Sequence, residues 1–201
     1  MENLVVLPAF PLGVIVFPGE EFYLHIFEQR YKQLIKEAKS EGTTFCIPFI
    51  DKGKTHEFGA LVKVKTVFSE YPTGEMDIAV EGVGIFSFSN LIDPDVDKLY
   101  SKALIEIVNS PVATADQLLS VRPLLMEYLQ LKKGEPVNLG AGRPFTSYDA
   151  ATMINLPTEK KYLFISLESE SQRISWLRNE LKVLLQSRKM ELQLNENFYL
   201  N

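Results

Sequence analysis

The chain has 201 residues, of which 46% are hydrophobic and 23% are charged, so it can bury a core and does not have the composition of a disordered protein. Its formal net charge of −5 argues against general binding to nucleic-acid phosphates, and its single cysteine, Cys46, excludes an internal disulfide bond. The N-terminus lacks the basic segment of a signal peptide, and no apolar run approaches the ~18 residues that span a bilayer. We therefore expect a cytoplasmic protein without a membrane segment.

Residues 1–110 are expected to form mainly β-strands. A first strand covers Leu4–Leu7, and Val14–Phe17 is a run of β-branched and aromatic residues that is typical of a buried strand. Pro18–Gly19 ends that strand, because proline cannot donate to a sheet and glycine permits unusual turn dihedrals. Extended chain then resumes at Phe22–Leu24.

One helix is predicted from about Phe27 to Gly42, because the apolar spacing changes to three or four residues there. Glu28 and Lys32 lie four residues apart on the polar face and are expected to form an ion pair. The predicted buried face consists of Phe27, Tyr31, Leu34, Ile35 and Ala38.

Five further strands are predicted after the helix. They cover Thr43–Ile50, Ala60–Phe68, Met76–Glu81, Ile85–Leu91 and Leu99–Val108. In the second of these, alternation assigns one face to Ala60, Val62, Val64, Thr66 and Phe68. Tyr71–Gly74 is a turn signal that joins two strands as a hairpin, and Gly82 with Gly84 marks a bend or bulge. Short strands in this arrangement favour a small curved sheet or a partly closed barrel.

Residues 111–201 are expected to form a bundle of about four helices. Capping-box patterns begin helices at Thr114 and Ser169, Ser147 and Pro157 are further starts, and Pro123 should kink its helix or move its start. The last helix is expected to bury Ile174, Leu177, Leu181 and Leu184. Gly134–Pro144 is read as a loop, and the tail from Met190 to Asn201 either docks or frays.

The segment Leu12–Gly19, LGVIVFPG, followed by Leu24–Glu28, LHIFE, closely resembles the opening of the Lon protease N-terminal domain, the substrate-binding part of that family. Ser147–Ala151 and Arg173–Leu177 resemble the helical half of the same domain, in the form of the short stand-alone bacterial members. Gln29 departs from the family, where proline is usual. The motif positions with an expected structural role are Pro11, Leu12, Phe17, Pro18, Gly19, His25, Phe27, Glu28, Arg30 and Tyr31.

The resemblance implies an α+β fold. Residues 1–110 would form a PUA-like curved β-sheet or pseudo-barrel with one inserted helix, and residues 111–201 would form the C-terminal helical bundle with its tail. It also implies a non-catalytic substrate-binding module, because the chain contains no phosphate-binding glycine loop and neither the ATPase nor the serine-lysine protease part of full-length Lon.

We expect no cofactor and no metal ion. His25, His56 and Cys46 lack the spacing of metal ligands. An enzyme alternative remains, in which a small hydrolase uses His25 with Glu28, or Cys46 as a nucleophile. The competing, purely structural interpretation is that His25 helps to start the helix. A second alternative is an RNA-binding PUA-like protein, which the net charge opposes.

The hypothesis we favour is recognition of exposed apolar segments of unfolded or client proteins, as an adaptor or regulator of proteolysis with a protease as a candidate partner. Several aromatic residues fall outside the predicted core faces, including Tyr100. The expected binding residues are Phe22, Tyr23, Tyr71 and Pro72, of which the last two lie at the hairpin tip. The competing interpretation is that these side chains cover the seam between the β half and the helical half.

Overall fold

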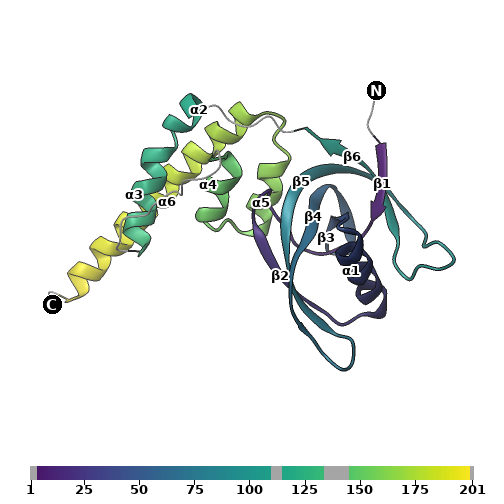
Figure 1. The fold of residues 1–201 in the computed structure, drawn as a ribbon. Coiled ribbons are helices and arrows are strands. Elements are labelled where there is room, and N and C mark those ends of the chain that lie inside the picture. The colour runs from purple at the N-terminus through teal and green to yellow at the C-terminus, as the bar shows by residue number, and fades with distance from the viewer. Residues whose placement is uncertain (1–3, 110–114, 134–144, 200–201) are drawn as a thin grey trace. The chain divides into compact units, whose positions relative to one another are not determined.

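The computed structural model describes residues 4–109, 115–133 and 145–199, and the chain divides into two compact units, Met1–Asn109 and Ser110–Asn201 (Figure 1). The described elements of the first unit are β1 (Leu4–Pro8), β2 (Glu21–Ile26), α1 (Gln29–Glu41), β3 (Thr44–Asp51), β4 (Lys54–Glu70), β5 (Met76–Ile92) and β6 (Lys102–Val108). Those of the second unit are α2 (Ala115–Leu119), α3 (Arg122–Lys133), α4 (Ser147–Met153), α5 (Thr158–Ile165) and α6 (Glu170–Tyr199).

The strands of the first unit form one curved antiparallel sheet in the order β1-β6-β5-β4-β3, and β2 pairs with the first part of β5. The chain that leaves β1 then runs beside β3, because Ala9 bridges Cys46 and Leu12 bridges Phe49 in parallel. These bridges join the two ends of the sheet into a partly closed barrel. The predicted α+β fold, with a curved sheet, an inserted helix and C-terminal helices, is confirmed.

Helix α1 packs its apolar face into the core of this unit. Tyr31, Leu34, Ile35 and Ala38 are each no more than 6% exposed. Phe27, which was predicted on the same face, is 61% exposed. The helix begins at Gln29, so Phe27 still belongs to extended chain and its side chain does not follow the helical spacing.

The polar side of α1 also differs from its prediction. Lys32 is 7% exposed, and its ammonium donates to the Thr73 carbonyl at 3.0 Å. Glu28 therefore pairs with Arg30, at 2.7 Å, instead of with Lys32. Gly42 ends the helix with φ of 66°, as the sequence predicts.

The segment Val14–Phe17 is buried but is not a strand. Ile15, Val16 and Phe17 are at most 2% exposed, yet no strand is assigned to them. The Phe17 carbonyl lies so close to β5 that a Cβ atom on Gly82 would be 2.1 Å from its oxygen. Core packing and this approach to a glycine hold the segment, so its predicted burial is right and its predicted strand pairing is wrong. The break after Phe17 is confirmed, since Gly19 has φ of 83°.

Strand β4 contains bulges that reverse its faces. Its register with β5 shifts between Val64 and Thr66 and again between Val67 and Ser69. Each shift adds one unpaired residue to β4, so Val67 packs against the core while Phe68 is 57% exposed. The prediction that Thr66 and Phe68 share the face of Ala60 is therefore wrong. Ile85–Leu91 is the continuation of β5, because the predicted irregularity at the glycines bends the strand without ending it.

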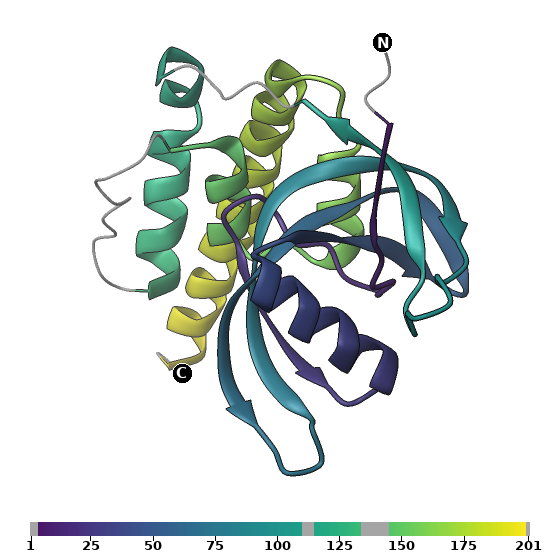
Figure 2. The same cartoon turned by 45° about the vertical axis from the view of Figure 1, so that its right-hand side comes forward.

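In the second unit, α3 lies alongside α6 (Figure 2). Pro123 stands in the first turn of α3, so it moves the helix start as expected and separates α2 from α3. Thr146, one residue before the predicted Ser147, caps α4 in a capping box with Asp149, and Ser169 caps α6 as predicted. The structure thus describes five helices in this unit where about four were expected.

The core of the second unit is formed by leucine-rich faces of α3 and α6. Leu177, Leu181 and Leu185 are at most 5% exposed, and Leu185 replaces the predicted Leu184 because the spacing there is four residues. Residues 190–199 continue α6, so the tail does not fray up to that point, and its docking stays a prediction. Thr114, the loop at 134–144 and the last two residues lie outside the described residues.

Candidate functional site

Strand β2, the first half of β5 and the end of β4 form a three-stranded arm, which comprises residues 21–27 and 64–81. One face of the arm packs on the core through Leu24, Val67 and Ile78. The other face points away from that core. The β4–β5 hairpin extends beyond the closed part of the sheet (Figures 1 and 2), so this second face is supported by strands and not by a mobile loop.

Four aromatic side chains of the arm are largely exposed. Tyr23 is 66%, Phe27 61%, Phe68 57% and Tyr71 43% exposed. The rings of Tyr23 and Phe68 stack with centroids 5.8 Å apart, and the His25 ring lies 6.2 Å from Phe27 and 6.3 Å from Tyr71. These four aromatic residues and His25 form one continuous surface, which we call the aromatic patch.

Local sequence explains how the patch is presented. In β2, Tyr23 and His25 alternate with Phe22 and Leu24, which pack against the core. In β4, the bulge turns Phe68 outward beside Tyr23. Phe22, which we expected in the binding surface, is therefore half-buried on the opposite face.

Asp77 holds the hairpin end of the patch in place. Its carboxylate accepts a hydrogen bond from the Tyr71 hydroxyl at 2.6 Å and lies 2.7 Å from Nδ1 of His25. These bonds, first that from Tyr71 and then that to His25, lower the pKa of Asp77, and the bond to Asp77 raises the pKa of Tyr71. His25 is thus part of a strand and an anchored surface cluster, and it does not start the helix. Pro72 is exposed at the turn beside Tyr71.

Acidic side chains border the patch. The arm contains one lysine, Lys65, which pairs with Glu21. Its five carboxylates are Glu21, Glu70, Glu75, Asp77 and Glu81. Lys36 and Lys63, which lie outside the arm, pair with Glu70 and Glu81 at 3.2 Å, so the carboxylates without a lysine partner among the described residues are Glu75 and Asp77 beside His25. Their charge disfavours a polyanionic ligand.

The residues of the hydrolase alternative are not brought together. His25 is bonded to Asp77, whereas Glu28 is bonded to Arg30. Cys46 is fully buried, its thiol donates to the Pro8 carbonyl at 3.2 Å, and burial raises its pKa to about 12. A thiol with this pKa is not ionised near neutral pH and is a poor nucleophile. Within the described ranges, no three His, Cys, Asp or Glu side chains are grouped so that they could hold a metal ion, and no helix is long and apolar enough to cross a membrane.

Tyr100 is also placed differently from its prediction. It is 4% exposed, and its hydroxyl donates to Glu37 on α1. Burial and this bond raise the pKa of Tyr100. It is a core residue and has no part in the patch. Conversely, Phe27 and Phe68 are patch residues that the sequence pattern assigned to apolar faces, Phe27 by helical spacing and Phe68 by strand alternation.

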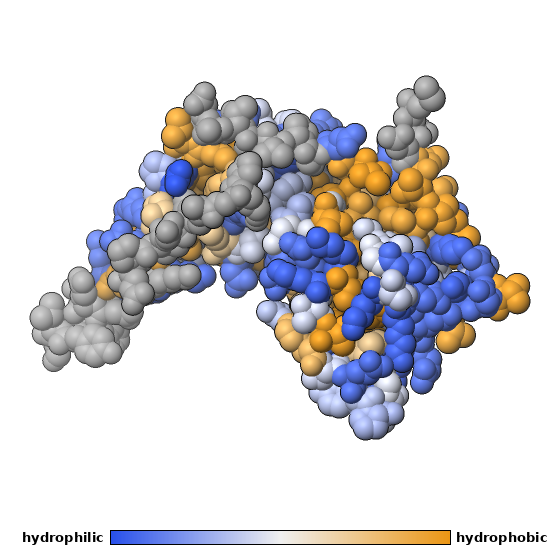
Figure 3. Space-filling model, in the orientation of Figure 1, coloured by the Kyte–Doolittle hydropathy of each residue, from blue (hydrophilic) through white to orange (hydrophobic). Residues whose placement is uncertain are grey.

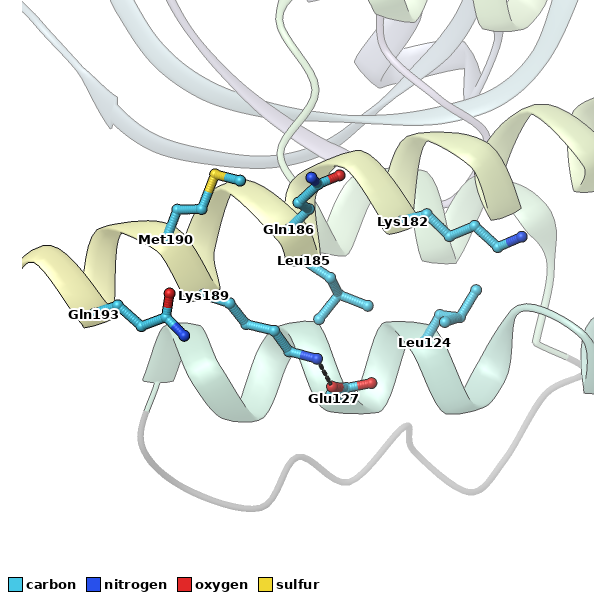
Figure 4. A pocket seen from close by; sticks show the side chains of 8 residues that line it. All are labelled: Leu124, Glu127, Lys182, Leu185, Gln186, Lys189, Met190 and Gln193. Carbon is cyan, nitrogen blue, oxygen red and sulfur yellow. Dashed lines mark ion pairs between the residues drawn. The ribbon is translucent and has the colours of Figure 1, made fainter.

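Two other surfaces of the described residues expose apolar side chains or form a groove. Figure 3 shows hydrophobic side chains over β1 and β6, where Leu4 and Val6 are 47% and 48% exposed. Figure 4 shows an open groove between α3 and α6, which Lys189 crosses to reach Glu127 at 2.7 Å. The groove is lined by Leu124, Glu127, Lys182, Leu185, Gln186, Lys189, Met190 and Gln193. The first surface is aliphatic and the second is mixed in charge, and neither combines several exposed aromatic rings with anchoring hydrogen bonds.

Comparisons with known proteins agree with this architecture. The profile of the ATP-dependent protease La (LON) substrate-binding domain matches residues 6–186. A Lon N-terminal domain protein from Xanthomonas campestris has a similar structure, with a TM-score of 0.63 at 16% identity over 86% of this chain and 96% of that chain. The N-terminal domain of Lon protease from the Mycobacterium avium complex gives a TM-score of 0.54 at 15% identity over 92% of this chain and 98% of that chain. A search of curated proteins found no match.

Proposed function

Because the chain belongs to the family of Lon substrate-binding domains, we propose that it binds exposed apolar segments of unfolded or client proteins through the aromatic patch. The observation that supports this most directly is the exposure of four aromatic side chains on one sheet face. Soluble proteins rarely expose such groups together unless the surface has a binding role.

The physical chemistry of the patch suits a binder that does not require one sequence. Each aromatic ring can cover a client's apolar side chain, and burial of apolar area contributes roughly 25 cal/mol per Å². The costs of association consume much of this gain, so we expect weak binding with rapid exchange. Strand pairing and the anchoring of Tyr71 by Asp77 keep the rings ordered before a client arrives, which lowers the entropic cost of each contact.

Such a module would act in proteolysis by presenting clients, as an adaptor or regulator, to a protease. The family and the chemistry of the patch support this role. It requires no catalytic group in this chain, and the separate partners of His25 and Glu28 and the buried Cys46 are consistent with that. The acidic border of the patch also makes a protein segment a better partner than RNA.

The test compares two pairs of substitutions on two exposed apolar surfaces. Tyr23→Ser with Phe68→Ser removes the stacked pair, and Leu4→Ser with Val6→Ser is the matched control on β1. We expect the first variant to lose most of its capture of a reduced, chemically unfolded model protein, and the control to retain it. The loss should persist at high salt, because apolar contacts are not screened as ion pairs are.

Both variants must unfold cooperatively in the same experiment. A folded Tyr23/Phe68 variant that captures unfolded protein as well as the natural chain would overturn the assignment of the patch. Loss in the β1 control alone would move the site to β1. Salt-sensitive binding of RNA, without capture of unfolded protein, would favour the nucleic-acid alternative instead.

A further inference from the structure

The hydrogen-bonding direction of β2 follows from its neighbours. The Glu75 carbonyl, just before β5, accepts from the Tyr71 N–H at 2.9 Å at the hairpin end. In the antiparallel alternation, the odd-numbered residues of the hairpin from Glu75 to Glu81 therefore direct their backbone groups toward β4. The even-numbered residues of this stretch therefore bond to β2. The bond from the Gly82 N–H to the Glu20 carbonyl, at 2.9 Å, follows the same alternation.

It follows that Glu21, Tyr23 and His25 direct their backbone N–H and C=O groups away from β5. Within the described residues, β2 pairs only with β5, and no hydrogen bond from another residue reaches the backbone of these three. By contrast, the opposite ends of the sheet are joined through residues 9–12 and β3. The free edge of β2 therefore runs directly beside the aromatic patch.

This edge lacks the usual protection of edge strands. Natural sheets block free edges with charged side chains, above all lysine, or with proline or bulges. Glu21–Ile26 contains no proline or lysine, its carboxylate Glu21 is paired with Lys65, and its register with β5 is unbroken. The unpaired N–H and C=O groups of such an edge can bond to the backbone of another extended segment. A helix cannot take that place, because its backbone groups already bond to one another within the helix.

We propose that an extended segment of a partner protein adds to β2 as a further strand, so that its alternate side chains lie beside Tyr23 and His25. This inference rests on the proposed function and specifies the form of the ligand. Main-chain hydrogen bonds supply affinity without sequence specificity, and the aromatic patch favours apolar side chains at every second position. Three of the arm's five carboxylates pair with lysines, whereas Glu75 and Asp77 beside His25 have no lysine partner among the described residues, so the segment that fits best also carries Lys or Arg.

Amide hydrogen exchange of the natural chain tests this without a substitution. The probe is a short peptide in which Lys alternates with Val and Phe. Its binding should slow exchange at the amides of Tyr23 and His25, which face the free edge, by about tenfold or more. The amides of Phe22 and Leu24 already bond to β5, so their exchange should stay unchanged and they serve as internal controls.

A matched pair of N-methylated peptides separates strand addition from side-chain docking. An added strand turns only every second N–H toward β2, so methylation of one alternate set should weaken binding about tenfold, while methylation of the other set should not. The side chains are identical in both peptides. Replacing each Lys by Glu should weaken binding at low salt, and equal affinity would overturn the assigned charge of the partner.

The outcomes distinguish the two proposals. Suppose that capture of unfolded protein needs the patch, but all methylated peptides bind with equal affinity and amide exchange at Tyr23 and His25 does not change. This result would overturn strand addition and leave the proposed function standing. Failure to bind either peptide or unfolded protein would overturn both. Protection of Tyr23 and His25 in the free protein that disappears on dilution would assign the edge to a second copy of the chain and overturn the partner named here.

Discussion

Aromatic side chains are buried in the closed part of the sheet and exposed on the outward face of the arm. In the closed part, Phe45 and Phe86 are fully buried, whereas in the arm Tyr23 and Phe68 are more than half exposed. The same strands, β4 and β5, run through both regions. The difference comes from what covers each face. Residues 9–12 and α1 complete the core of the closed part, whereas the outward face of the arm carries ring stacking and the polar contacts of Asp77 and Lys65, with no packed layer over it among the contacts described. A single sheet can thus supply a core and a binding surface.

The largest expected effect comes from truncating one aromatic residue on each side of Gln29, where α1 begins, and this tests whether burial and exposure differ as described. Tyr31 is 6% exposed and its ring lies 3.9 Å from that of Phe10, so Tyr31→Ala should cost roughly 3 kcal/mol of unfolding free energy. Phe27→Ala removes an exposed ring four residues earlier and should cost less than about 0.5 kcal/mol. Urea unfolding of both variants measures the difference. Equal losses would show that Phe27 is part of the core.

The packing of the Val14–Phe17 segment against β5 can be tested by substituting two glycines of that strand. Gly82→Ala would place a Cβ atom 2.1 Å from the Phe17 carbonyl oxygen, so we expect a loss of about 2 kcal/mol or more because the backbone must move. A Cβ atom on Gly84 would meet only the Leu61 side chain, with Cδ1 nearest at 3.3 Å, so Gly84→Ala should cost clearly less. The midpoints of thermal unfolding compare the two. A Gly82 variant as stable as the Gly84 variant would mean that the buried segment is loosely held.

These two tests also separate what the sequence could predict from what it could not. The face of Tyr31, Leu34 and Ile35 was predictable because helical spacing is a local property. The outward position of Phe68 was not, because a bulge depends on how β4 registers with β5, and strict alternation assigned the residue to the core. Tyr23 and Tyr71 were predicted as surface residues because they fall outside the apolar alternation.

Two further features could not be predicted from the sequence: the residue at which a helix begins, and whether a buried segment pairs as a strand. Phe27 was misassigned because the apolar pattern does not mark whether a helix begins two residues earlier or later. Val14–Phe17 has the composition of a strand, and composition cannot tell a paired strand from an extended segment held by packing. The anchoring of Tyr71 and His25 by Asp77 joins residues from β2 and the hairpin, so only the folded sheet shows it.

A smaller, pH-dependent effect on the free energy of unfolding is expected at Glu37 of α1. Burial opposes ionisation of Glu37, but hydrogen bonds from Tyr100, Lys98 and Gln33 outweigh it and lower its pKa from 4.5. A lowered folded-state pKa stabilises the protein above the unfolded-state value, and this stability is lost as the pH falls below about 4.5 and through the folded-state pKa. Glu37→Gln should therefore cost about 1 kcal/mol near pH 7 and much less near pH 3. A pH-independent difference in urea unfolding would contradict this assignment.

The smallest expected effect concerns the patch itself. Phe68→Ser removes an exposed ring from a bulged residue, so the free energy of unfolding should change by less than about 0.5 kcal/mol. Together with the expected loss of client capture in the Tyr23/Phe68 variant, this would separate binding from stability within one sheet. A loss as large as that of Tyr31→Ala would place Phe68 in the core and remove it from the patch.

The pairing of β1 with β6 also constrains the order of events during synthesis. Leu4 lies opposite Glu106, so the first strand of the chain must wait for a partner made about a hundred residues later. Until β6 has left the ribosome, β1 and the edge of β5 that faces β6 have no strand partner, and the barrel cannot close. Contacts so distant in sequence make folding slow, and a nascent chain in this state exposes strand edges that invite aggregation. The N-terminal unit therefore completes its folding only when nearly all of it has been synthesised.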